Sequence, residues 1–215
     1  MKNIFLSFCI FFLSLSGYSE TEIEFSLNSD SIWRGLTQNN GEPTLGAEIN
    51  FSLKNGFFSE AWIESCCSEN ETYPNREVGY VFGYQKEINR DFDVSISYVG
   101  TNYPNSKNDN YDELELNFSF YDFEISYYKG LDNFPDYYEF SYSYYFLNNS
   151  LNLSYGDFGS YENDSSSNGS NYSIGIDVLQ EDFTLSFFYY YFNSNGSSNL
   201  DKDGAVFSIS KKTSF

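Results

Sequence analysis

The sequence predicts an all-β protein, namely a transmembrane antiparallel up-and-down β-barrel of about twelve strands that follows a cleaved signal peptide. Three observations support this fold class. Apolar and polar residues alternate with a period of two along most of the chain, as in strands with one apolar and one polar face. Short connections alternate with long polar ones, and aromatic residues, which favour strands, make up 21% of the chain.

Residues 1–19 have the features of a secretory signal peptide, which leaves residues 20–215 as a single barrel domain. Lys2 provides a positive start, an apolar stretch follows, and a small-x-small cleavage site ends at Ser19. The alternative, a membrane anchor, needs roughly 20 consecutive apolar residues. The apolar stretch gives way to Ser, Gly and Glu well before that length.

Six strands are expected in the first half of the barrel domain. In most of them Ile, Leu, Val, Phe or Tyr occupies every second position, with Glu, Asp, Asn, Ser or Gly between. The pattern is clearest in 92–98 and 113–120 and weakest in 57–65, where Phe58 and Trp62 share a face with two glutamates. The expected strands span residues 22–27, 45–53, 57–65, 78–84, 92–98 and 113–120.

Six further strands continue the period of two to the end of the sequence. Tyr and Phe supply much of the apolar face here. Phe215, a terminal aromatic residue on an alternating last strand, is expected to be the signal through which the barrel-assembly machinery binds the chain. The expected strands span residues 123–127, 138–146, 151–155, 172–178, 183–191 and 205–215.

The connections follow the pattern of bacterial outer-membrane barrels, in which short turns face the periplasm and long loops face the outside. The expected short turns are 54–56, 88–91, 121–122, 147–150 and 180–182, and the loops are 28–43, 66–75, 101–110, 132–136, 156–170 and 193–203. Ten tyrosines near predicted strand ends are expected to form an aromatic girdle at the lipid headgroups. They are Tyr98, Tyr103, Tyr111, Tyr121, Tyr137, Tyr138, Tyr155, Tyr161, Tyr172 and Tyr191.

The composition excludes several functions. With 31 acidic and 11 basic residues, the chain has a formal charge of −20, which argues against nucleic acid as a partner. It contains no His, which excludes Ser-His-Asp and Cys-His catalysis and His-ligated zinc, and no cofactor or metal site is expected. The adjacent Cys66 and Cys67 fit neither a zinc knuckle nor a redox motif. A vicinal disulfide and two free thiols both remain open for this pair.

Several segments carry a family resemblance. Residues 29–38 read Ser-Asp-Ser-Ile-Trp-Arg-Gly-Leu-Thr-Gln, and Pro43, Gly56-Phe57-Phe58, Trp62, Glu77-Val78-Gly79-Tyr80, Tyr98, Tyr103-Pro104 and Tyr111-Asp112-Glu113 follow. Together they resemble the TorF family of proteobacterial porins, formerly of unknown function. Thr37, Phe58 and Glu60 depart from the family pattern without breaking the strand alternation, and beyond Gly130 the similarity is mainly alternation. The resemblance implies an outer-membrane barrel that acts as a channel, and it names no substrate.

The polar face of the expected strands collects carboxylates and few bases, and it is expected to line a lumen. Arg34 is the one base that the family-like motif places among these acids, near the top of the first strand. It either pairs with an inward Glu at a constriction or fixes the loop through hydrogen bonds to carbonyls, and the second interpretation is favoured. The pore-lining candidates are Arg34, Glu24, Glu48, Glu60, Glu64, Glu77, Asp93, Glu113, Glu115, Glu124, Glu139 and Asp177.

These features predict a porin-like channel for passive diffusion of small solutes, in the outer membrane of a Gram-negative bacterium, surrounded by lipid and lipopolysaccharide. Carboxylates along an aqueous lumen raise the local cation concentration, so a preference for cations is expected. The alternatives are a non-conducting structural or surface-recognition barrel and a secreted soluble β-sandwich. A glycosidase that uses Glu113 and Glu115 is disfavoured, because acids alternate along any acidic lumen wall, and no enzymatic activity is expected.

Overall fold

The computed structural model describes residues 19–65, 76–104, 110–131, 134–158, 169–194 and 202–215. Apart from Ser19, the expected signal peptide lies outside the described residues, as do Cys66, Cys67 and Tyr161. In the described ranges, no helix is long and apolar enough to cross a membrane.

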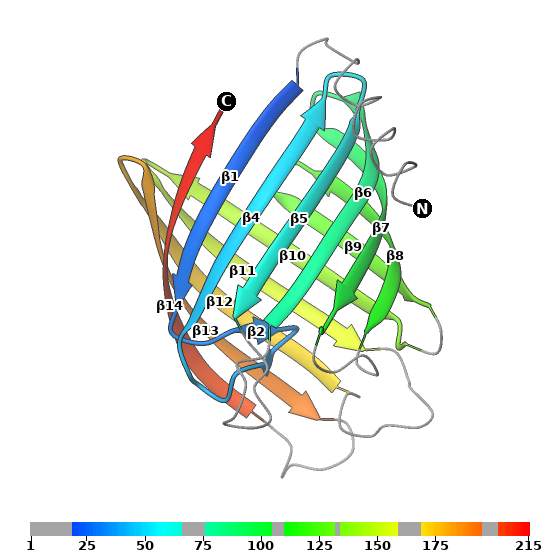
Figure 1. Cartoon of the computed structure of the whole chain (residues 1–215). Helices are drawn as coiled ribbons and strands as arrows, with labels where there is room; N and C mark the ends of the chain where they lie inside the picture. The colour runs from blue at the N-terminus through cyan, green and yellow to red at the C-terminus, as the bar shows by residue number, and fades with distance from the viewer. Residues whose placement is uncertain (1–18, 66–75, 105–109, 132–133, 159–168, 195–201) are drawn as a thin grey trace.

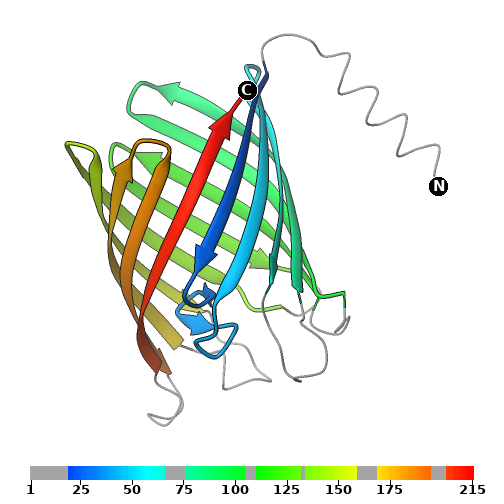
Figure 2. The same ribbon diagram turned by 60° about the vertical axis from the view of Figure 1, so that its left-hand side comes forward.

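Twelve antiparallel strands form a closed barrel (Figures 1 and 2). Strands that follow one another along the barrel wall are paired, and β1 pairs with both β4 and β14, so that the sheet has no free edge. This confirms the predicted fold class, and the alternative of two stacked sheets was wrong. The barrel strands are β1 (Ser19–Asn28), β4 (Thr44–Leu53), β5 (Phe57–Ser65), β6 (Arg76–Asn89), β7 (Phe92–Asn102), β8 (Tyr111–Phe120), β9 (Phe123–Gly130), β10 (Tyr137–Phe146), β11 (Asn149–Phe158), β12 (Gly169–Gln180), β13 (Phe183–Ser194) and β14 (Lys202–Ser214).

Each expected strand is present, and most are longer than the alternation indicates. The largest extension is in β6, which continues through a polar stretch to Asn89 with a bulge between Glu87 and Asn89. Backbone pairing needs no apolar side chain, so the ladder continues where the alternating pattern stops. The sequence pattern therefore locates strands reliably but underestimates their ends.

The two faces of the barrel wall differ in chemistry. Apolar side chains point outward in register around the sheet and are exposed, as Phe25 (62%) and Ile96 (56%) illustrate. By the same register, the predicted strand acids all lie on the inward face, together with Ser and Asn. A sheet that is apolar outside, polar inside and free of edges is the arrangement that lipid requires.

Strand β5 was the least regular prediction, and its pairing with β6 explains why. The inward side chains of Phe58 and Trp62 lie over Gly83 and Gly79 on β6, their direct cross-strand partners. A Cβ at either glycine would overlap the aromatic ring. Aromatic residues that cover glycines in this way complete the packing of a sheet, so these two rings are inside although the barrel's other apolar residues mostly face out.

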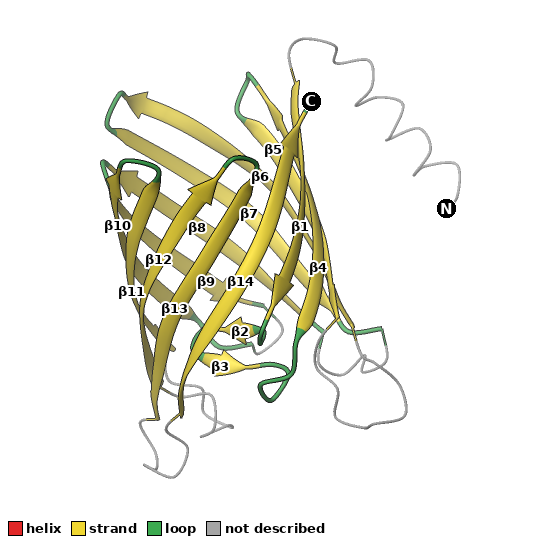
Figure 3. Cartoon of the chain, turned by 90° about the vertical axis from the view of Figure 1, so that its left-hand side faces the viewer, coloured by secondary structure: helices red, strands yellow, loops and turns green. Residues whose placement is uncertain are grey.

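The two ends of the barrel differ as well. The short turns and the C-terminal end of β14 lie at one end, the turn end, and the connection from β1 to β4 lies at the other, the loop end (Figures 1 and 3). This connection contains a two-stranded hairpin, β2 (Ile32–Trp33) and β3 (Leu36–Thr37), which forms a separate small sheet at the loop end. The connection that the sequence predicted over 28–43 is present between β1 and β4, although part of it folds into this hairpin. Arg34 lies at the turn of the hairpin, so its predicted place at the top of the first strand was wrong.

Candidate functional site

The β2–β3 hairpin is closed by a tight turn at Arg34 and Gly35. Their backbones have φ values of +49° and +79°, which a two-residue hairpin loop of type I′ requires at both central positions. Across the hairpin, the Thr37 hydroxyl donates to Asp30 at 3.0 Å, and the Gln38 N–H donates to the Ser31 carbonyl at 2.7 Å. These two bonds join the arms of the hairpin at its open end, away from the tip.

Glu64 of β5 holds the base of the hairpin to the barrel wall. Its carboxylate accepts hydrogen bonds from Asn28 at 3.2 Å, from Ser31 at 3.0 Å and from Thr44 at 2.6 Å. These donors lie at the end of β1, at the start of the hairpin and at the start of β4. One carboxylate therefore joins three successive parts of the chain and fixes where the hairpin leaves the wall.

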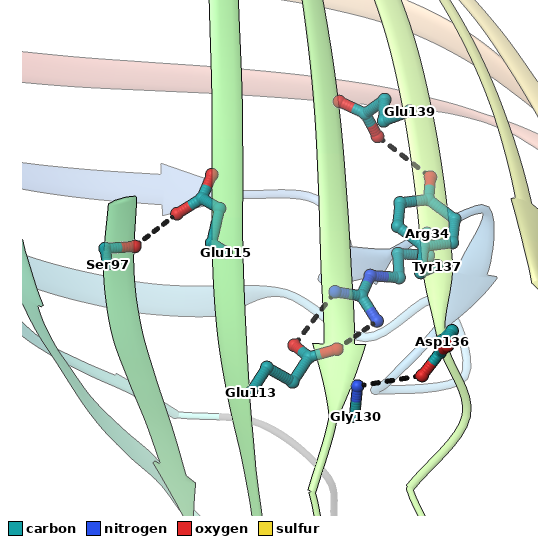
Figure 4. Close-up of polar contacts among 8 residues, drawn as sticks. All are labelled: Arg34, Ser97, Glu113, Glu115, Gly130, Asp136, Tyr137 and Glu139. Atoms are coloured by element: carbon teal, nitrogen blue, oxygen red, sulfur yellow. Dashed lines mark hydrogen bonds and ion pairs between the residues drawn. The ribbon is translucent and has the colours of Figure 1, made fainter. Parts of the chain in front are cut away.

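The tip of the hairpin is held by an ion pair with the opposite wall. The Arg34 guanidinium donates to both carboxylate oxygens of Glu113 on β8, each at 2.9 Å (Figure 4). The side chains of Arg34 and Glu113 are only 8% and 3% exposed. A buried, bidentate pair of this kind fixes both position and orientation.

Aromatic rings surround the same guanidinium. Its central carbon lies 4.1 Å from the ring centre of Tyr137, 4.6 Å from that of Tyr128, 4.7 Å from that of Trp33 and 5.7 Å from that of Phe158. Tyr137 also donates its hydroxyl to Glu139 at 2.8 Å (Figure 4). Ring faces attract a cation, so the rings add to the attraction of the carboxylate.

The hairpin crosses the lumen from one wall to the other. It leaves β1 and returns to β4, whereas its tip contacts β8 to β13, which include the opposite side of the barrel. Trp33 packs on Phe158, with ring centres 5.5 Å apart, and a Cβ added to Gly35 would lie 2.5 Å from the Cβ of Asn171 on β12. The hairpin therefore narrows the lumen at the loop end of the barrel.

These contacts decide between the two interpretations of Arg34. In the described ranges the Arg34 guanidinium bonds to an inward Glu, as the alternative proposed, and not to loop carbonyls, as the favoured interpretation proposed. The sequence could not identify Glu113 as the partner, because the two residues are 79 positions apart. The aromatic cage was also missed, although the doublets Tyr127-Tyr128 and Tyr137-Tyr138 place aromatic residues on both faces of their strands.

Most of the predicted acids are engaged by neighbouring side chains. Besides the contacts of Glu64, Glu113 and Glu139, the Ser97 hydroxyl donates to Glu115 at 2.7 Å (Figure 4). These bonds fix the positions of the carboxylates on the inner side of the wall. The other donors are Trp62 and Tyr103 to Glu77, Asn50 to Glu48, Asn117 to Glu124, and Ser150 and Asn152 to Asp177.

A group of acids without the hairpin contacts lies nearer the turn end of the lumen. Glu24 and Glu48 are direct cross-strand partners, and Glu60 interacts electrostatically with Glu48 and with Glu115. Lys212 lies beside them and pairs with Glu22 at 2.6 Å. The inner wall of the described barrel is therefore strongly acidic, with few bases.

Of the nine girdle tyrosines that the structure describes, three point inward, so that part of the prediction was wrong. Tyr103, Tyr111 and Tyr137 are buried or nearly so at the loop end. Inside the barrel their hydroxyls find polar partners, as when Tyr103 donates to Glu77 at 2.8 Å, which allows an aromatic residue on the polar face. Burial raises the pKa of the Tyr103 phenol far above its ordinary value, so it remains a donor.

Outside the strands, Asp136 braces the connection between β9 and β10. Burial alone would raise the pKa of its carboxyl, but hydrogen bonds from Lys129, Tyr127 and the Gly130 N–H outweigh burial and lower the pKa below its ordinary value of 3.8. Lys129 contacts both Asp136 oxygens, at 2.9 and 3.0 Å. These bonds fix the backbone just before Tyr137, the next residue in the chain, whose ring contacts the Arg34 guanidinium.

Comparison with known proteins agrees with this architecture. A family model described as "Bacterial protein of unknown function (Gcw_chp)" matches residues 15–211. No curated protein sequence gives a significant match. Among solved structures, the KdgM porin has a TM-score of 0.63 at 9% identity, over 91% of this chain and 99% of that chain.

Two other solved structures broaden the comparison. The NanC porin has a TM-score of 0.59 at 10% identity, over 90% of this chain and all (100%) of that chain. The outer membrane phospholipase A from Escherichia coli has a TM-score of 0.53 at 10% identity, over 90% of this chain and 92% of that chain. At such low identities the likeness shows the fold alone, and that fold carries both porins and an enzyme.

Proposed function

The chain belongs to the Gcw_chp family, and we propose that it is an outer-membrane channel through which small solutes diffuse passively, with a preference for cations. The observation that carries this proposal is the acidic inner wall of a closed barrel with an apolar outer face. Carboxylates around an aqueous lumen attract cations and repel anions. Glu24 and Glu48, which are direct cross-strand partners, are the acids best placed to do so away from the hairpin.

The location follows from the outer face. A barrel whose exposed apolar side chains form a continuous band is suited to the outer membrane of a Gram-negative bacterium, and proteins named as porins share its fold. We propose that residues 1–19 direct export, that Phe215 engages the barrel-assembly machinery, and that lipid and lipopolysaccharide surround the barrel. The motif in residues 29–38, which forms the hairpin, supports kinship with the TorF porins.

The solutes are expected to differ from an acidic sugar polymer. One structure of the KdgM porin is a complex with disordered oligogalacturonate, which carries a carboxylate on each sugar. The acidic wall of the present chain would repel such a polyanion. We therefore propose small cations and cationic or neutral solutes as the permeant species.

The test of ion preference is the reversal potential of the refolded full chain in a planar bilayer under a KCl gradient. We expect a sign that corresponds to cation preference, and a smaller value in E24Q/E48Q, which replaces two cross-strand carboxylates of the lumen by uncharged amides. The matched control, E181Q/D182N, removes two charges from an exposed turn between β12 and β13 and should change the potential less. Anion preference of the wild-type channel would refute the proposal.

A non-conducting barrel is the second candidate, and the hairpin that crosses the lumen favours it. Single-channel recording separates the two, because a barrel closed by its hairpin shows no conductance until the hairpin is removed. An enzymatic role has less support. The likeness to phospholipase A concerns the fold, the chain has no His, and Glu113 is already bound to Arg34 through both oxygens.

A further inference from the structure

We propose that Glu113, Tyr128, Tyr137 and Phe158 form a guanidinium-binding site, which Arg34 occupies as a tethered ligand and which a soluble guanidinium compound occupies in its place. The site would take alkylguanidinium compounds and solutes with an arginine-like end. The binding site goes beyond the proposed function, and only its effect on conductance rests on that function.

The geometry of the wall fits the shape of a guanidinium. The Glu113 oxygens accept two hydrogen bonds of 2.9 Å from the two terminal nitrogens, a fork that an ammonium group cannot reproduce. The rings of Tyr137 and Tyr128 lie 4.1 and 4.6 Å from the guanidinium carbon. A carboxylate combined with aromatic faces is the usual chemistry for binding organic cations.

The site belongs to the barrel and does not depend on the hairpin for its walls. Glu113, Tyr128, Tyr137 and Phe158 lie on β8, β9, β10 and β11, which are paired in that order. Among the described rings around the guanidinium, Trp33 alone comes from the hairpin, which also supplies the cation itself. Removing the Arg34 side chain therefore leaves the four barrel residues of the site in place, with the Glu113 carboxylate no longer paired to a cation.

Without a guanidinium in the site, the buried carboxylate of Glu113 would lack a compensating cation. In the described part of the chain every buried side-chain nitrogen and oxygen has a hydrogen-bond partner. Without Arg34, Glu113 would become a buried carboxylate that has lost both of its guanidinium donors, which is strongly unfavourable. A soluble guanidinium compound restores the same two bonds.

Tethering explains why Arg34 normally holds the site. Even on a flexible segment, a tethered ligand has an effective concentration on the order of millimolar, and the hydrogen bonds that fix the hairpin hold Arg34 closer to its site than a flexible segment would. A soluble compound must exceed that concentration to compete in the wild-type protein, whereas it meets no competitor when the side chain is absent. In a conducting barrel, competition would free the hairpin tip and widen the lumen.

The test uses the full chain carrying R34A, refolded in detergent micelles and titrated calorimetrically with methylguanidinium. We expect saturable binding to R34A at a concentration at least tenfold lower than in the wild type, and binding of methylammonium and urea at least tenfold weaker than that of methylguanidinium. R34A/E113Q should not bind. Heat-dependent gel migration verifies folding, and R34Q, which keeps a side chain of similar length without charge, serves if R34A does not fold.

The outcomes separate this inference from the proposed channel. If folded R34A or R34Q binds methylguanidinium no better than methylammonium, or if R34A/E113Q keeps the binding, the inference is wrong whatever the conductance. If the wild-type barrel does not conduct while R34A binds as expected, the channel proposal fails and the binding site stands.

Discussion

At the scale of single residues, the position of the hairpin depends on one buried ion pair. Arg34 and Glu113 each satisfy the other's charge in a site that excludes most water. Loss of one partner of such a pair typically costs about 3–5 kcal/mol, because the remaining charge stays buried and unpaired. The free energy of opening the hairpin should therefore respond strongly to either residue, even where the barrel itself stays folded.

We expect E113Q to lower the free energy of hairpin opening by about 3 kcal/mol, or about a hundredfold in the opening equilibrium. Hydrogen exchange of the hairpin amides, among them the Gln38 N–H that bonds to Ser31, measures this change. The control is E115Q, on the same face of β8 but bonded to Ser97. Equal protection of the hairpin in both variants would contradict the importance of the pair.

Gly35 makes a second prediction at this scale. Alanine at a left-handed position costs about 1–2 kcal/mol, and at Gly35 the new Cβ would also approach Asn171. Gly41 has a similar φ of +82° but no atom within 4 Å of an added Cβ. Hydrogen exchange should therefore show faster opening of the hairpin tip in G35A than in G41A, and the reverse order would show that the tip does not touch β12.

At the scale of elements, the barrel strands could be predicted from the sequence and the hairpin could not. Alternation is a local pattern, and it identified each barrel strand because one face meets an apolar environment along its whole length. The hairpin has only two residues in each strand, and its place in the lumen depends on partners as distant as Glu113. The sequence identified which acids lie on the polar face. It could not show which of them bond to the hairpin, such as Glu64 and Glu113, and which lie away from it, such as Glu24 and Glu48.

Replacing residues 31–38 by Gly and Ser at the same length should increase single-channel conductance. The hairpin contributes no strand to the closed sheet, so the barrel should still show heat-dependent gel migration. The control replaces residues 39–42, which lie in the same connection but form the turn in which Glu42 N–H donates to the Asn39 carbonyl. Unchanged conductance in the 31–38 variant would mean that the hairpin does not limit passage.

At the scale of the whole molecule, the central property is the separation of an apolar outside from an acidic inside. Neighbouring residues of one strand belong to different environments, as Ser173 and Ile174 of β12 illustrate. Ser173 shares a hydrogen bond of 2.7 Å with Ser154 on the inner face, whereas Ile174 is 49% exposed on the outer face. Stability in a bilayer should therefore depend on the face that a charge occupies more than on its place in the sequence.

We expect I174R to destabilise the barrel by about 2–4 kcal/mol, the cost of an arginine on the lipid face near the bilayer midplane. S173R places the same side chain one residue away in the acidic lumen and should cost less. Urea unfolding of both variants in lipid vesicles measures the difference. Equal destabilisation would show that the outer face does not meet hydrocarbon.

The separation of Arg34 and Glu113 by 79 positions also sets an order of events during folding. Closing so long a segment costs conformational entropy that only completed contacts offset. The cage itself does not exist until β8, β9, β10 and β11 have joined the sheet. The first connection of the chain is therefore among the last to reach its final place, and a half-assembled barrel has an interior that its own hairpin does not yet obstruct.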